Sequence, residues 1–142
     1  FHEIFGHCAM LTHPAFADFT AHYGKLGVSA SKQERAYLAR LYWFTVEFGL
    51  LNSAQGLKIY GGGILSSPQE TEYAYASAVP ERREFNISDV LRTRYRIDVL
   101  QPIYYQLNSV NDLYDLANTD IMAEVAKARE LGLFPLPESI AH

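Results

Sequence analysis

The sequence predicts a single domain that is mainly α-helical with a small β component. Its longest periodic stretch, from Lys32 to about Gly49, carries apolar residues at the three- and four-residue spacings of one helix face. Residues 31–34 and 67–70 each place a serine three positions before a glutamate, which is the pattern of a capping box at a helix N-terminus. Short apolar segments after residue 56 supply the expected strands. With 142 residues, the chain has the usual length of one domain.

Three helices are expected in the first fifty residues. Residues 1–11 are mostly apolar and suit a buried helix. Pro14 is a favourable first-turn residue, and a short amphipathic helix is expected over 15–23, ended by Gly24 and followed by a loop to residue 30. The third helix begins after the first capping box and places four apolar side chains on one face: Tyr37, Leu41, Phe44 and Phe48.

The remainder of the chain is expected to combine short strands with helices. The segments on either side of the glycine triplet 61–63 look extended, with a sharp bend between them, and residues 79–85 look turn-like. Strands are expected at residues 95–99 and 103–107. Helices are expected over 68–77, from Asn86 or Ser88 to 93, over 109–117, and over 120–131 with Gly132 as the stop.

The composition argues against several classes of partner. A formal net charge of −4 offers no basic face to nucleic acid or to an anionic membrane. No stretch reaches the length of a membrane span, and no basic segment followed by an apolar run marks a signal peptide. Cys8 is the single cysteine, which fits a reducing compartment. We therefore expect a cytoplasmic protein that binds neither nucleic acid nor membrane.

The first eight residues contain candidate metal ligands. His2 and His7 lie five positions apart, with Glu3 beside the first. This is not the His-Glu-x-x-His pattern of zinc proteases, because residues five apart lie about 140° apart around a helix. Two such histidines can still bind one metal ion if the helix is locally distorted. The spacing alone leaves open that both are ordinary histidines in an apolar segment.

Glu47 is the third candidate ligand. It lies near the C-terminal end of the expected 32–49 helix, where the helix dipole disfavours a negative charge, and its neighbours are almost all apolar. A buried carboxylate in that position needs a cationic partner. Two histidines and one carboxylate form the facial triad of non-haem iron(II) oxygenases, which keeps coordination positions open. The alternative is a solvated glutamate in the last helical turn.

Four segments, taken in order, resemble one enzyme family. They are residues 1–8 (Phe-His-Glu-Ile-Phe-Gly-His-Cys), 42–50 (Tyr-Trp-Phe-Thr-Val-Glu-Phe-Gly-Leu), 60–67 (Tyr-Gly-Gly-Gly-Ile-Leu-Ser-Ser) and 101–105 (Gln-Pro-Ile-Tyr-Tyr). Together they closely resemble the catalytic domain of the pterin-dependent aromatic amino acid hydroxylases, from residue 1 to about residue 120. The similarity is greatest to the bacterial phenylalanine 4-hydroxylase branch. It implies the fold of that catalytic domain, with its N-terminal part missing.

The resemblance implies a role for each matching position. The iron(II) ligands would be His2, His7 and Glu47. Ser66 would hydrogen-bond a ligand histidine and so fix the orientation of its ring. Glu3 would face the pterin and Tyr42 would lie beside the iron, so both are assigned to catalysis and to cofactor binding. The positions implied to bind the substrate are Trp43, Phe48, Gly63, Ser67, Glu70, Tyr95 and Ile97. Two of these, Ser67 and Glu70, also form the second capping box and so have a purely structural alternative.

The activity implied by the resemblance is hydroxylation of L-phenylalanine to L-tyrosine, with dioxygen and a tetrahydropterin (tetrahydrobiopterin or a related bacterial pterin) at iron(II). Tyrosine hydroxylases carry an aspartate where this chain has Ile97. An apolar residue gives a substrate phenol no partner, which favours phenylalanine. The alternatives are a tryptophan or tyrosine hydroxylase, or a non-catalytic fragment that kept the fold.

The resemblance also bears on how complete the chain is. The family's arginine for the substrate carboxylate, and most of its pterin-stacking loop, precede the iron motif and have no counterpart here. Residues 1–142 are therefore expected to be the C-terminal portion of a longer catalytic domain, with little iron binding or turnover alone. We expect a monomer or a weak homo-oligomer.

Overall fold

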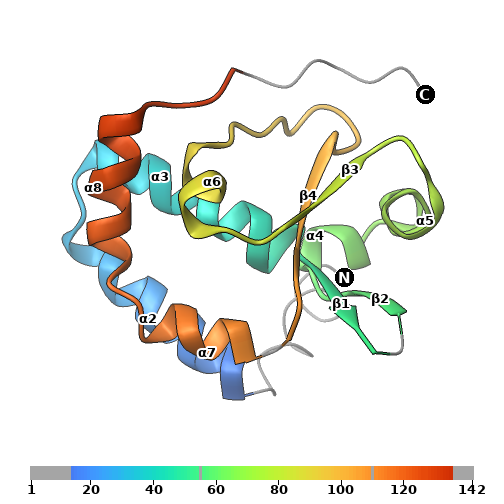
Figure 1. Cartoon of the computed structure of the whole chain (residues 1–142), viewed down its shortest axis with the longest axis horizontal. Helices are drawn as coiled ribbons and strands as arrows, with labels where there is room; N and C mark the ends of the chain where they lie inside the picture. Colours follow the sequence, from blue (N-terminus) through green and yellow to red (C-terminus); the bar gives the residue numbers. More distant parts are fainter. Residues whose placement is uncertain (1–13, 55, 110, 136–142) are drawn as a thin grey trace.

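Figure 1 shows the computed structural model of the chain, which describes residues 14–54, 56–109 and 111–135. One side of the molecule is a group of packed helices, and the other is a four-stranded sheet with two further helices beside it. The predicted fold class, mainly helical with a small β component, is confirmed. Within these ranges, no helix is long and apolar enough to cross a bilayer. The helices are α2 (Pro14–Ser29), α3 (Lys32–Tyr42), the π-helix η2 (Trp43–Glu47), α4 (Gly62–Leu65), α5 (Pro68–Ala76), α6 (Ile87–Arg92), α7 (Asn111–Ala117) and α8 (Ile121–Leu131).

Helix α2 is longer than the sequence pattern predicts. The expected end at Gly24 is wrong, because the helix continues through Gly24 and Gly27 to Ser29. A glycine inside a helix costs about 1 kcal/mol relative to alanine. Packing offsets that cost, since α2 lies along α7 and Leu26 packs against the main core. The helix expected over residues 1–11 lies outside the described residues.

The first capping box is confirmed at the start of α3. The Glu34 backbone N–H donates to Ser31 Oγ at 3.1 Å, and the Ser31 N–H donates to the Glu34 carboxylate at 2.8 Å. These hydrogen bonds lower the pKa of the Glu34 carboxyl. The expected single helix over 32–49 changes type partway, because α3 ends at Tyr42 and the chain continues as η2.

The strands form one sheet in the order β2-β1-β4-β3, with β1 (Leu50–Ser53) antiparallel to β2 (Gly56–Ile59). Strand β4 (Ile103–Leu107) runs parallel to both β1 and β3 (Glu81–Glu84). The predicted strand at 103–107 is confirmed. The stretch before the glycines is β2, whereas Ile64 and Leu65 after them are helical in α4 rather than extended.

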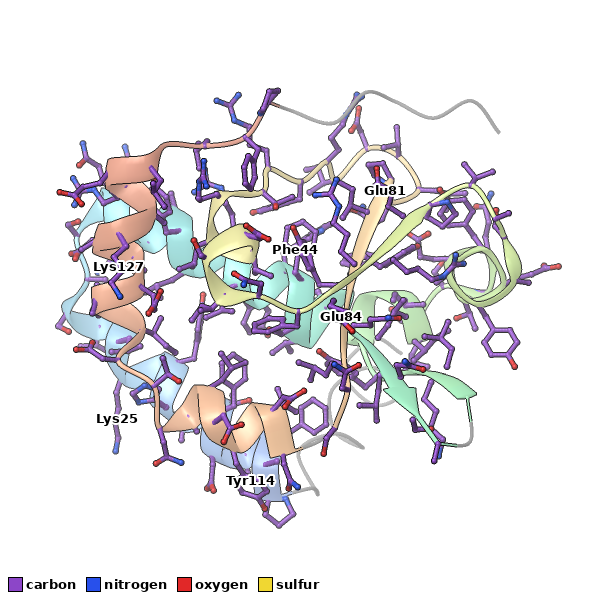
Figure 2. All side chains as sticks on the ribbon, in the orientation of Figure 1. Lys25, Phe44, Glu81, Glu84, Tyr114 and Lys127 are labelled. Atoms are coloured by element: carbon purple, nitrogen blue, oxygen red, sulfur yellow. The ribbon has the colours of Figure 1, made fainter. Side chains whose placement is uncertain are left out.

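Two further expectations for the sheet are wrong. Residues 79–85 contain the edge strand β3 instead of a turn, with Glu81 and Glu84 at its two ends (Figure 2). Arg82 stabilises this polar strand by donating to the carbonyls of Ala74 and Ser77, each at 2.6 Å, at the C-terminal end of α5. Residues 95–99 are irregular instead of a strand. The backbone carbonyls of Arg96 and Val99 in this segment accept hydrogen bonds from the Gln101 side chain.

The short helices agree more closely with the sequence. Asn86, rather than Ser88, caps α6 by accepting from the Asp89 N–H at 3.2 Å. Asp120 caps α8 in the same way, and Gly132 ends that helix at a positive φ of 83°, where glycine is favoured. Helix α5 begins with Pro68 after the Ser67 cap, as predicted.

The core has two clusters of buried side chains. The larger lies between the packed helices and the sheet, where Phe44 (labelled in Figure 2) meets Tyr105 edge to face, with ring centroids 5.2 Å apart. The smaller contains Leu50, Ile64, Tyr73 and Tyr104, between the sheet and α4 and α5. Helix η2 lies at the junction, because Phe44 packs in the larger cluster and Phe48, just past η2, packs against the smaller one.

Candidate active site

The π-helix η2 places Glu47 just before β1, an interior strand of the sheet. Its wider turn is closed by a hydrogen bond from the Phe48 N–H to the Trp43 carbonyl, five residues earlier, at 2.8 Å. Such π-helical turns are frequent at functional sites. Glu47 is the last residue of η2 and is partly buried, with strand β1 beginning three residues later. The predicted position of Glu47 near a helix C-terminus is confirmed.

Two glycines of the triplet allow the chain to pass directly over the backbone of Glu47. A Cβ at Gly61 would lie 2.5 Å from the Glu47 carbonyl oxygen and 2.5 Å from the Gly49 nitrogen. A Cβ at Gly63 would lie 2.9 Å from that same carbonyl oxygen and 2.9 Å from the Phe48 ring. Real Cβ atoms do not approach backbone atoms so closely. The absence of these side chains therefore allows the start of α4 to pack directly against the backbone of Glu47.

An aromatic stack extends from η2. The Trp43 indole stacks on the Phe48 ring and on the Tyr95 ring, each with centroids 4.4 Å apart. Phe44 meets Tyr95 edge to face at 6.4 Å. Three residues that the resemblance implies for the substrate pocket, Trp43, Phe48 and Tyr95, are thus in contact. Trp43 lies at the centre of the stack, with Phe48 toward the pocket.

A pocket of about 340 Å³ lies beside this stack. Its lining comes from three separate segments and includes five residues predicted to bind substrate: Phe48, Gly63, Ser67, Glu70 and Ile97. Ile97 lies at its rim, with 78% of its surface exposed among the described residues. The pocket therefore brings together positions that are up to fifty residues apart in the sequence.

Glu70 is buried and bonded to the sheet. Its carboxylate accepts from the Tyr104 hydroxyl at 2.9 Å and from the Gln101 N–H at 3.4 Å. Burial, followed by the nearby Glu70 charge, raises the pKa of the Tyr104 hydroxyl. The second capping box is therefore only half confirmed: Ser67 Oγ accepts from the Glu70 N–H, but the Ser67 N–H donates to the Ile64 carbonyl. The Glu70 carboxylate instead connects α5 to β4.

Ser66 and Tyr42 are two further residues that the family resemblance implies for the surroundings of the iron. Ser66 Oγ donates to the Gly62 carbonyl at 2.8 Å. Tyr42, the last residue of α3, packs its ring against Tyr23 with centroids 5.3 Å apart. Burial, together with the two neighbouring tyrosines, raises the pKa of Tyr23 to about 12.

The predicted residues His2, Glu3 and His7 lie outside the described residues. Among the described residues, no three His, Cys, Asp or Glu side chains are grouped as a metal site. Of the predicted iron ligands, the structure therefore places Glu47 only.

Sequence reasoning missed the part that Gln101 plays in this pocket. Gln101 lines the pocket, is 98% buried (2% exposed), and bonds to Trp43. The available signal was its position directly before Pro102, at the start of a strongly apolar strand, where a large polar side chain must find partners.

The fold and this pocket define a class of protein. The family model for the biopterin-dependent aromatic amino acid hydroxylases matches residues 1–131, and the chain belongs to that family. The chain is 61% identical over 135 residues to phenylalanine-4-hydroxylase of Vibrio cholerae, covering 95% of this chain and 47% of the relative. It is 58% identical over 133 residues to phenylalanine-4-hydroxylase of Pseudomonas aeruginosa, covering 94% and 50%.

Solved structures that resemble this chain are also phenylalanine hydroxylases. The apo structure of the cold-active phenylalanine hydroxylase from Colwellia psychrerythraea superposes with a TM-score of 0.93 at 55% identity, covering 96% of this chain and 53% of that one. The iron- and phenylalanine-bound crystal structure of phenylalanine hydroxylase from Chromobacterium violaceum gives a TM-score of 0.87 at 42% identity, covering 94% and 50%. The chain thus spans about half the length of the relatives that it matches.

Proposed function

We propose that this chain forms the C-terminal portion of the catalytic domain of a phenylalanine 4-monooxygenase, which converts L-phenylalanine to L-tyrosine with dioxygen and a tetrahydropterin. The observation that carries the proposal is the pocket at the Phe48 ring, lined by five of the residues that the family resemblance implies for substrate binding. The names of the Vibrio cholerae and Pseudomonas aeruginosa relatives support phenylalanine as the substrate.

Iron(II) fits the residues at this site. Glu47 offers a carboxylate at the end of η2, and His2 and His7 would complete a set of two nitrogen ligands and one oxygen ligand of the kind used by non-haem iron oxygenases. From the family resemblance, the Ser66 hydroxyl, which donates to the Gly62 carbonyl, is proposed to hydrogen-bond a ligand histidine and so to fix the orientation of that ring. The iron-bound relative from Chromobacterium violaceum supports this choice of metal. When bound, iron and pterin supply the activation of dioxygen.

The residues of this chain hold the substrate. The Phe48 ring, supported from behind by Trp43 and Tyr95, offers a flat apolar wall for the phenylalanine side chain. Gly63 has no side chain to fill the pocket, and Ile97 adds apolar surface at the rim. A bound aromatic ring would exclude water from the pocket beside Phe48. Glu3 and Tyr42 are proposed to contact the pterin.

The proposal covers the whole catalytic domain, so its tests use a full-length enzyme, meaning a protein of the relatives' length that contains these residues. We propose a cytoplasmic enzyme that is a monomer or a weak homo-oligomer. The deciding experiment incubates this enzyme with iron(II), tetrahydrobiopterin, dioxygen and each aromatic amino acid in turn, and identifies the products. We expect tyrosine from phenylalanine as the main product. Hydroxytryptophan or dihydroxyphenylalanine as the main product would instead assign a different substrate.

Replacing Ile97 with aspartate tests the rim of the pocket. We expect kcat/KM for phenylalanine to fall by about tenfold, because a carboxylate at the rim replaces roughly 1–2 kcal/mol of apolar contact with a group that must stay hydrated. Steady-state kinetics on the full-length enzyme measures the effect. Val28→Asp is the matched control, since Val28 is equally exposed on α2 away from the pocket. Equal kinetics for Ile97→Asp and wild type would remove Ile97 from the substrate site.

A further inference from the structure

Gln101 connects three segments that surround the pocket. Its side chain accepts a hydrogen bond from Trp43 Nε1 at 3.2 Å, and it donates to the carbonyls of Arg96 at 2.7 Å and Val99 at 3.3 Å. Its backbone joins α5, because its N–H donates to Glu70 at 3.4 Å and its carbonyl accepts from the Tyr73 hydroxyl at 3.0 Å. One buried residue thus contacts η2, the irregular segment 95–99, and α5.

The partners fix the orientation of the Gln101 amide. An indole N–H can only donate, so the amide oxygen must face Trp43. The two carbonyls can only accept, so the amide nitrogen must face Arg96 and Val99. Both amide hydrogens are then used, and a flipped amide would lose all three bonds. The side chain therefore behaves as a rigid link of fixed length.

The two ends of this link support two different parts of the pocket lining. At the oxygen end, Trp43 lies behind the Phe48 ring. At the nitrogen end, the bonded carbonyls belong to residues on either side of Ile97, which lines the rim. Residues 95–99 have no strand pairing, so these hydrogen bonds replace the ladder that would otherwise hold the segment.

We propose that Gln101 is a positioning residue that sets the width of the substrate slot and so selects for a single aromatic ring of the size of phenylalanine. Gln101 acts through Trp43 and the 96–99 backbone, without carrying out chemistry itself. The inference rests on the proposed function, because the slot is assigned to an aromatic amino acid. It adds a specificity determinant outside the metal ligands and the aromatic wall.

The test measures kcat and KM for L-phenylalanine and L-tryptophan in the full-length enzyme with Gln101→Met, which keeps the length of the side chain and removes all three hydrogen bonds. We expect KM for phenylalanine to rise about tenfold with kcat changed less than about threefold, since one lost neutral hydrogen bond corresponds to about this factor in affinity. The preference for phenylalanine over tryptophan should fall by about tenfold. Calorimetric titration with phenylalanine should show the same loss of affinity without turnover.

Gln106→Met is the matched control, because Gln106 lies in β4, five residues after Gln101, and does not line the pocket. It should keep the wild-type preference. Gln101→Glu is the second variant: it keeps an acceptor for Trp43 but loses the donors to Arg96 and Val99, and it should also relax the preference.

The outcomes separate the two proposals. A wild-type enzyme that hydroxylates no phenylalanine overturns the proposed function. If the wild type is active but both Gln101 variants keep the preference within twofold, the positioning role is wrong and the proposed function stands. If neither variant yields folded enzyme while Gln106→Met does, Gln101 is a structural residue and the inference is overturned.

Discussion

Full-length enzyme with Glu47→Ala is expected to retain no bound iron and to show no measurable phenylalanine hydroxylation. The substitution removes the only oxygen ligand of the proposed triad and its only negative charge. Loss of an outer-shell partner alone usually lowers metal affinity 10–100-fold, so loss of a direct ligand should lower it by more than about 100-fold. Elemental analysis of the purified enzyme measures the iron, and product analysis measures the activity.

Glu130→Ala is the matched control for this experiment. Glu130 is also a glutamate near the C-terminal end of a helix, in the last turn of α8, but it is exposed and distant in sequence from the pocket. The control should keep wild-type iron content and activity, and circular dichroism should show both variants to be folded. Stoichiometric iron in folded Glu47→Ala would exclude Glu47 as a ligand.

Gly61→Ala should cause a large loss of stability, because the added methyl group has no space. The added Cβ would lie 2.5 Å from the Glu47 carbonyl oxygen and the Gly49 nitrogen, which are backbone atoms and cannot rotate away. Overpacking of this kind costs about 1–3 kcal/mol and occasionally more. The backbone hydrogen bond from the Gly61 N–H to the Gly49 carbonyl, 3.0 Å long, would be strained as well. We expect a loss of about 3 kcal/mol in the free energy of unfolding, with weaker iron binding because Glu47 is displaced.

Gly24→Ala adds the same methyl group, but we expect it to raise the free energy of unfolding instead of lowering it. Gly24 lies inside α2, and an added Cβ would meet no atom within 4 Å. Alanine in a helix interior is favoured over glycine by about 0.5–1 kcal/mol, so this variant should be slightly more stable than wild type. Urea denaturation of the full-length enzyme compares the two. Gly61→Ala with wild-type stability would show that the loop over Glu47 is not closely packed.

Local signals predicted much of the fold. The Ser31 capping box, the Asn86 cap and the Gly132 stop act within one or two turns. The capping box and the stop are where the sequence predicts them, and Asn86 is one of the two caps that the sequence offered for α6. The errors are cases in which tertiary contacts override local preference. Gly24 does not end α2 because the helix packs on α7, and the polar segment 81–84 is a strand because β4 pairs with it.

The candidate site was also predictable only in part. The family resemblance implied Phe48, Gly63 and Glu70 as substrate-binding residues, and the fold brings them to one pocket. The π-helical turn was not predictable, because it depends on one hydrogen bond that skips five residues, and an apolar helix pattern does not distinguish it from an α-helix. Gln101 was missed because its three side-chain partners lie on segments whose proximity only the fold reveals.

The central proposal is that Glu47, together with His2 and His7, binds iron beside the aromatic pocket. Its most direct test is an anomalous difference map, measured at the iron absorption edge, from crystals of the full-length enzyme loaded with iron(II). We predict a single peak bonded to the Glu47 carboxylate and to the imidazoles of His2 and His7. A peak bonded to other residues, or a bound iron that Glu47 does not contact, would contradict it.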